Sequence, residues 1–107
     1  MRMIYNKIIP FKGFKAINLF GVLFVRKGQT MSKDNMRHEE IHSLQMREMF
    51  YVGFYLWYAV EWMIRFLSCF KAKQAYYNIS FEKEAYTFQW SDSYLSWREP
   101  YEWMHYL

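Results

Sequence analysis

The feature that most constrains the fold is residues 31–52, a stretch that contains neither proline nor glycine. Near its start stand Ser32, Asp34 and Asn35, whose side-chain oxygens can accept hydrogen bonds from the free N–H groups of a helix start. We therefore expect a helix here. A helix that ran on through the next apolar stretch would overrun a chain of 107 residues, so Gly53 is the expected break.

The expected helix carries an H-E-x-x-H motif, in which Glu39 follows His38 and His42 stands four residues after His38. Side chains four residues apart lie one turn apart on the same helix face. Both imidazoles could therefore reach a single Zn²⁺ at about 2.0–2.1 Å. Glu39 would point to the open side of the metal, where a carboxylate can accept a proton from water. So short a motif recurs by chance, and it needs a third ligand.

Cysteine usage restricts the kind of metal site. Cys69 is the single cysteine of the sequence, so an internal disulfide and a cysteine-rich zinc site are both excluded. A metal ion would have to be held by histidine and carboxylate. A lone cysteine also fits a reducing compartment, and we expect the protein in the cytoplasm.

Charge is distributed unevenly. The net charge is +4, and residues 1–37 hold eight of the fourteen Lys and Arg residues but only one acidic residue. The basic residues are spread along the segment, which favours a solvated rim around strands over a surface for anionic lipid or an acidic ligand. Nothing in the sequence resembles a nucleic-acid-binding module, and we expect no nucleic-acid partner.

Two segments near the N-terminus have the composition of strands. Residues 3–12 predict a short edge strand that ends at Pro10 and Gly13. Residues 14–27 are rich in β-branched and aromatic residues and predict a second strand, bulged or turned near Asn18 or Gly21.

Residues 49–70 are the most apolar part of the chain and allow two interpretations. Glu61 and Arg65 are the only charges between Met49 and Lys71, and both would be costly within a bilayer. We favour an amphipathic aromatic helix that packs over the motif helix; a helix that lies on or spans a membrane is the alternative. Three tyrosines at helical spacing support the amphipathic reading: Tyr51, Tyr55 and Tyr58.

A further helix is expected after a polar linker at residues 71–74. Asn78 or Ser80 could cap it, and it would run to about Trp90. Glu82 and Glu84 fall in its first turn, where a carboxylate suits the positive end of the helix dipole.

His38, Glu39 and His42, followed forty residues later by Glu82 with Ala85 three positions on, resemble the gluzincin metallopeptidases. The small size is similar to that of the minimal members, the minigluzincins. The resemblance implies that His38, His42 and Glu82 bind zinc and that Glu39 is the catalytic base.

The resemblance covers residues 34–90 and includes one departure. Tyr86 stands where many gluzincins have an aspartate that orients a zinc-bound histidine, and a phenol cannot supply the charge of a carboxylate. No residue identifies itself as the stabiliser of an oxyanion; four are candidates by residue type, namely Tyr76, Tyr77, Arg98 and His105.

Together these features predict one α+β, zincin-like domain over residues 1–107, a small N-terminal sheet packed on about three helices. Its parts would be a β-rich segment 1–30, a helical zinc-site segment 31–92 and an irregular aromatic tail 93–107. The expected activity is zinc-dependent hydrolysis of a peptide or protein substrate. The alternative is a non-catalytic zinc-bearing interaction or membrane-surface protein.

Overall fold

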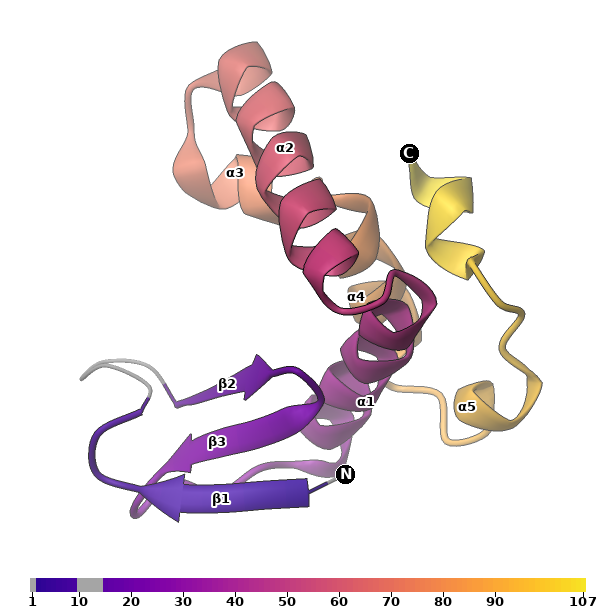
Figure 1. Ribbon diagram of the computed structural model, residues 1–107. Helices are drawn as coiled ribbons and strands as arrows, with labels where there is room; N and C mark the ends of the chain where they lie inside the picture. The colour runs from indigo at the N-terminus through magenta and orange to yellow at the C-terminus, as the bar shows by residue number, and fades with distance from the viewer. Residues whose placement is uncertain (1, 10–14) are drawn as a thin grey trace.

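Three short strands form a mixed sheet in the computed structural model, which describes residues 2–9 and 15–107 (Figure 1). The strand order is β1-β3-β2, with β1 parallel and β2 antiparallel to β3. The strands are β1 (Arg2–Asn6), β2 (Ala16–Leu19) and β3 (Val22–Arg26). Both β1 and β2 are therefore edge strands of the described sheet.

The turn expected within residues 14–27 lies at Phe20 and Gly21, which join β2 to β3. Both residues have positive φ, 53° and 88°, as a two-residue hairpin turn that matches the strand twist requires. Of the two predicted positions, Gly21 is the one that turns.

Strand β1 is shorter than the predicted strand over 3–12. Its last residue, Asn6, accepts hydrogen bonds at Oδ1 from the N–H groups of Ile8 and Ile9. This local turn ends the strand, because it bends the chain away from β3. The predicted stops at Pro10 and Gly13 lie outside the described residues.

Helix α1 (Lys33–Glu48) begins where the capping residues predict it. Ser32 is the N-cap, and its side chain accepts a hydrogen bond from the N–H of Asn35. The expected break at Gly53 is wrong, because Gly53 lies within the next helix. The chain turns instead at Phe50 and Tyr51, which both have positive φ.

Helix α2 (Val52–Cys69) packs one face against the rest of the protein, as predicted. Phe54 is buried and stacks on Phe81 of a later helix, α4 (Ser80–Phe88), with ring centroids 4.5 Å apart. Its ring also lies 6.1 Å from the imidazole of His42. Within the described residues, no helix combines the length and apolar character needed to cross a membrane.

The remaining chain adds four helical segments. They are α3 (Ala72–Tyr77), α4 (Ser80–Phe88), α5 (Tyr94–Trp97) and the 3₁₀ helix η1 (Glu102–Tyr106). Helix α3 replaces most of the polar linker expected at 71–74. The tail is less irregular than predicted, because Tyr94 and Trp103 anchor its two helical turns in the core. The predicted α+β class is confirmed.

Helix α4 ends close to the predicted position but is capped in an unexpected way. Its N-cap is Ile79, whose side chain makes no capping hydrogen bond, and neither Asn78 nor Ser80 fills that role. Instead, the carboxylate of Glu61 on α2 accepts hydrogen bonds from the N–H and the hydroxyl of Ser80, each 2.6 Å long. A buried carboxylate from another helix thus accepts the hydrogen bond of a backbone N–H at the start of α4 that has no partner within the helix.

Candidate metal centre

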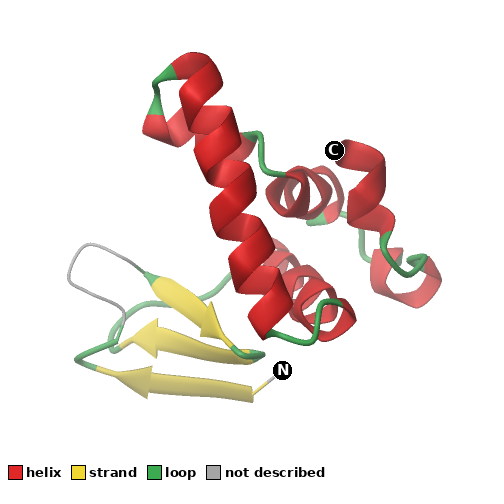
Figure 2. Cartoon of the chain, turned by 45° about the horizontal axis from the view of Figure 1, so that its top comes forward, coloured by secondary structure: helices red, strands yellow, loops and turns green. Residues whose placement is uncertain are grey.

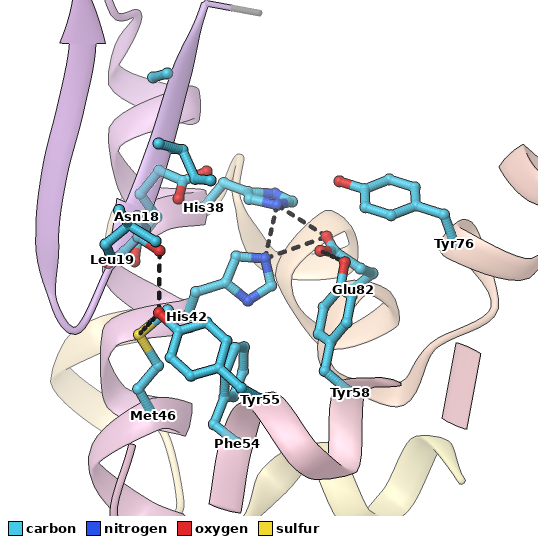
Figure 3. Close-up of a pocket in the computed structure, with 13 residues that line it drawn as sticks. Asn18, Leu19, His38, His42, Met46, Phe54, Tyr55, Tyr58, Tyr76 and Glu82 are labelled. Atoms are coloured by element: carbon cyan, nitrogen blue, oxygen red, sulfur yellow. Dashed lines mark hydrogen bonds and ion pairs between the residues drawn. The ribbon is translucent and has the colours of Figure 1, made fainter. Parts of the chain in front are cut away.

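The two histidines of the motif and Glu82 meet at one point between α1 and α4 (Figure 3). His38 and His42 extend from successive turns of α1, and Glu82 extends from the first turn of α4. The Nε2 atoms of the two imidazoles are 3.1 Å apart, and each lies 3.1 Å from Oε1 of Glu82. All three side chains are buried.

This spacing fits a tetrahedral metal ion. Three ligand atoms held at the usual Zn–N and Zn–O distances would be separated by roughly 3.3 Å, the edge of the tetrahedron. The observed 3.1 Å separations are close to that value. Two neutral imidazole nitrogens and one carboxylate oxygen are also a donor set that zinc accepts, and three ligands leave a fourth position open.

The far nitrogen of each imidazole is held by a glutamine. Nδ1 of His38 lies 2.7 Å from Oε1 of Gln89, and Nδ1 of His42 lies 2.7 Å from Oε1 of Gln45. An amide oxygen only accepts, so each Nδ1 must carry the proton. In a neutral imidazole the lone pair is then on Nε2, which faces the centre.

Gln45 is itself fixed by a buried polar network. Its Nε2 donates to the carbonyl of Phe81 and to Oε1 of Glu84, at 3.0 Å each, so its oxygen must face His42. Glu84 is fully buried and also accepts hydrogen bonds from Tyr94 and from Arg98. Arg98 reaches on to Glu48 at the end of α1.

Glu82 carries the negative charge of the site. Burial raises its pKa, but the adjacent imidazoles of His42 and His38 outweigh burial and lower the pKa well below its ordinary value. Burial also lowers the pKa of His42, and the charge and hydrogen bond of Glu82 overcome this and raise it to about 9. Without a metal ion, the pair is therefore an imidazolium and a carboxylate.

Tyrosine hydroxyls also act on the carboxylate of Glu82. The hydroxyl of Tyr58 on α2 donates to Oε2 at 2.8 Å. Burial and the charge of Glu82 raise the pKa values of Tyr58 and Tyr76, so both hydroxyls stay protonated donors. Tyr86 does not replace the missing aspartate as a hydrogen-bond acceptor; its ring packs on the imidazole of His38 at 4.5 Å.

A cleft of about 300 Å³ opens over the three residues. Strand β2, helix α1 and the inner face of α2 form its walls (Figure 3). Glu39 lines it beside His38 and His42. A shallower depression of about 200 Å³ adjoins it, and Ala16, His38, Glu39 and Tyr76 line both. Glu39 therefore stands at the junction of two hollows that together cross the site.

The edge of β2 faces this cleft. Arg26 N–H donates to the carbonyl of Lys15, so Lys15 belongs to a hydrogen-bonded pair of the β2–β3 ladder. By the alternation of an antiparallel ladder, the backbone groups of Ala16 and Asn18 point away from β3. The hydroxyl of Tyr55 already donates to the carbonyl of Asn18, which leaves the part near Ala16 for a ligand.

The four candidates for stabilising an oxyanion differ in their position relative to the cleft. Tyr76 lines the cleft. Arg98 is bound to Glu84 and Glu48, away from the cleft. Tyr77 packs against other tyrosine rings, and His105 is exposed beside Glu102.

Sequence reasoning did not assign the residues that orient the histidines. Gln45 follows His42 by three residues, and Gln89 lies 51 residues after His38; neither was assigned a role from the sequence. One signal was present, because Gln89 follows Glu82 by seven residues, two turns along the same helix face.

No protein-family model matches this chain, and no match is found among the curated proteins or the solved structures.

Proposed function

We propose that this protein is a zinc-dependent peptidase. The observation that carries the proposal is the convergence of His38 Nε2, His42 Nε2 and Glu82 Oε1 within 3.1 Å of one another beside Glu39. A structural zinc site is usually closed by four protein ligands, whereas these three leave a position for water or substrate. The likeness of the motif pair to gluzincins supports the same assignment.

Each residue then has a separate task. When bound, zinc supplies a Lewis acid that lowers the pKa of coordinated water to about 7 and polarises a peptide carbonyl. Glu39 accepts the proton of the attacking water at its carboxylate and returns it to the leaving amine. The protonated hydroxyl of Tyr76, which lies 3.2 Å from the hydroxyl of Tyr86, is a donor in the cleft that can stabilise the oxyanion.

The substrate would bind as an extended segment beside β2. The backbone groups of Ala16 point away from β3 and have no partner among the described residues. They lie on the edge that lines the cleft, and an added strand can pair with them. Tyr55 closes the edge at Asn18 and Phe20, so the pairing is short. A peptide or an unfolded protein segment fits this geometry.

The decisive experiment compares two neighbouring glutamates. Glu39→Gln should bind one zinc per chain with unchanged affinity but lose hydrolysis of a peptide library, because the change removes the proton carrier and no ligand. Glu40→Gln is the matched control, since Glu40 lines a separate hollow on the other side of α1. His42→Ala and Glu82→Ala should lose both zinc and hydrolysis.

A non-catalytic zinc protein is the competing proposal. Zinc binding by the wild type, together with no hydrolysis of any peptide in the library, would favour it. Full turnover by Glu39→Gln would overturn the assignment of the base. A cytoplasmic location remains part of the proposal, supported by the free thiol of Cys69.

A further inference from the structure

The outer face of α2 is apolar along its whole length. In both ribbon views α2 lies in front, and no other described element crosses its outer side (Figures 1 and 2). At the margin of this face the ring of Trp57 lies 5.5 Å from that of Trp103 in η1. The side chains on this face span about 140° of the helix by the helical repeat. They are 40–65% exposed: Val52, Leu56, Trp57, Val60, Met63, Ile64 and Leu67.

The charged groups of α2 all lie on its opposite face. Glu61 is buried and bound to Ser80, and the Nη2 of Arg65 lies 3.8 Å from it. The outer face therefore has no charge over five turns of helix. So large an exposed apolar surface is unusual on a soluble monomer and marks a binding surface.

The two ends of the apolar face carry positive charge. An exposed phenylalanine stands at each end, Phe50 before α2 and Phe70 after it, with exposures of 86% and 72%. Arg47 is exposed near the first, and Lys71 and Lys73 are exposed beside the second. Between residues 49 and 81 the only acidic residue is Glu61, which is buried.

This charge pattern distinguishes between two partners that could cover the face, a second copy of the chain and a lipid surface. If two copies packed through α2 in antiparallel fashion, Arg47 would meet Lys71 and Lys73 of the partner. Parallel packing would set the same lysines against each other. Between residues 49 and 81 neither arrangement supplies an exposed anion, and like charges across an interface oppose association. Phosphate groups of lipids complement both ends at once.

We propose that the outer face of α2 binds an anionic lipid surface, with the helix parallel to the surface. The apolar side chains enter the boundary between headgroups and acyl chains, while Lys71, Lys73 and Arg47 contact phosphates. This inference is independent of the metal centre, which lies against the inner face of α2.

The full chain can be tested with vesicles of phosphatidylcholine, with and without phosphatidylglycerol, in a flotation assay. Wild type should float with the anionic vesicles and be released by high salt. Ile64→Glu should lower binding at least about tenfold, because it places a charge in the apolar face. Ile8→Glu is the matched control, because Ile8 lies in the turn after β1 and is 80% exposed. This variant should bind vesicles like wild type.

A second pair of variants tests the charges without altering the apolar face. Lys71→Glu/Lys73→Glu should lose on the order of twentyfold or more in binding to anionic vesicles, since each lysine near a surface contributes about fivefold. Lys27→Glu/Lys33→Glu, at two exposed lysines after β3 and at the start of α1, should have a much smaller effect. Absence of wild-type binding to anionic vesicles would overturn the proposal. So would a lipid-free dimer that Ile64→Glu dissociates, because that result assigns the face to a second copy.

Discussion

The carboxylate of Glu61 accepts both polar hydrogens of Ser80, from its N–H and its hydroxyl, at 2.6 Å each. Ser80 is the first residue of α4, and Glu82 stands two residues later. The same carboxylate accepts a hydrogen bond from the indole of Trp57 at 3.2 Å. Helix α2 therefore fixes the start of the helix that presents Glu82 to the two histidines.

Glu61→Gln should destabilise the protein by about 2–4 kcal/mol. The amide keeps the shape but presents only one acceptor oxygen, so it leaves the buried N–H and hydroxyl of Ser80 and the partly buried indole N–H of Trp57 without a full set of partners. Urea unfolding followed by tryptophan fluorescence measures the difference. Glu99→Gln, at an exposed position, is the control and should change stability by less than about 0.5 kcal/mol. Equal unfolding midpoints for the two variants would contradict the capping role.

A change at a glutamine that holds a histidine of the metal centre should weaken zinc binding, although every metal ligand is kept. Gln45→Met removes the oxygen that accepts from Nδ1 of His42 at 2.7 Å, while it preserves most of the side-chain volume. We expect zinc to bind about 10–100-fold more weakly, which competition with a colorimetric chelator can measure.

Gln74→Met is the matched control for this change, because Gln74 is exposed on α3. Circular dichroism of Gln45→Met must match that of wild type for the comparison to hold. If a folded Gln45→Met protein binds zinc as tightly as wild type, then Gln45 does not orient His42.

The helix that bears the motif and the meeting of its two histidines could be predicted from local patterns, whereas Glu82 was expected as a ligand only from the resemblance to gluzincins. Ser32 caps α1 as its residue type suggests, and a spacing of four residues suffices to bring His38 and His42 together. The turn at Gly21 is equally local, because its positive φ is a property of that residue. In each case the signal and the structure involve neighbouring residues.

The parts that could not be predicted depend on distant contacts. Glu61 is separated from Ser80 by 19 residues, and Gln89 from His38 by 51. Neither distance is encoded in a periodic pattern. The break at Phe50 and Tyr51 also went against propensity, since non-glycine residues rarely take positive φ, whereas Gly53 continues in regular helix. Tertiary packing of α2 on α1 and α4 decided these features.

The raised pKa of His42 predicts how the stability of the metal-free protein depends on pH. Its value is about 9 in the folded protein against 6.5 for a free imidazole. A histidine whose pKa is higher in the folded than in the unfolded state stabilises the folded protein fully at pH values below the unfolded-state pKa. This stabilisation is lost as the pH rises through the folded-state pKa. We therefore expect the free energy of unfolding to fall by up to about 3 kcal/mol between pH 6.5 and pH 9 or slightly above.

Urea unfolding in the presence of a chelator, repeated at several pH values, measures this dependence. His42→Gln is the reference, because it lacks the titrating group and should show a much flatter profile over the same range. Glu82 contributes no slope in this window, since its lowered pKa lies far below it. Parallel profiles for wild type and His42→Gln would mean that Glu82 does not hold the proton on His42.

Two proline substitutions in β2 test whether substrate pairs with its free edge. The N–H of Ala16 points away from β3, so Ala16→Pro leaves the β2–β3 ladder intact and removes one donor from the cleft. We expect kcat/KM for peptides to fall about tenfold, mainly through KM, with little change in unfolding midpoint. Ile17→Pro is the contrasting variant. The N–H of Ile17 belongs to the pairing with Phe24, so the loss of this N–H should destabilise the sheet. If Ala16→Pro remains folded and hydrolyses peptides as well as wild type, substrate does not bind along this strand, and the cleft must present peptides to Glu39 in another orientation.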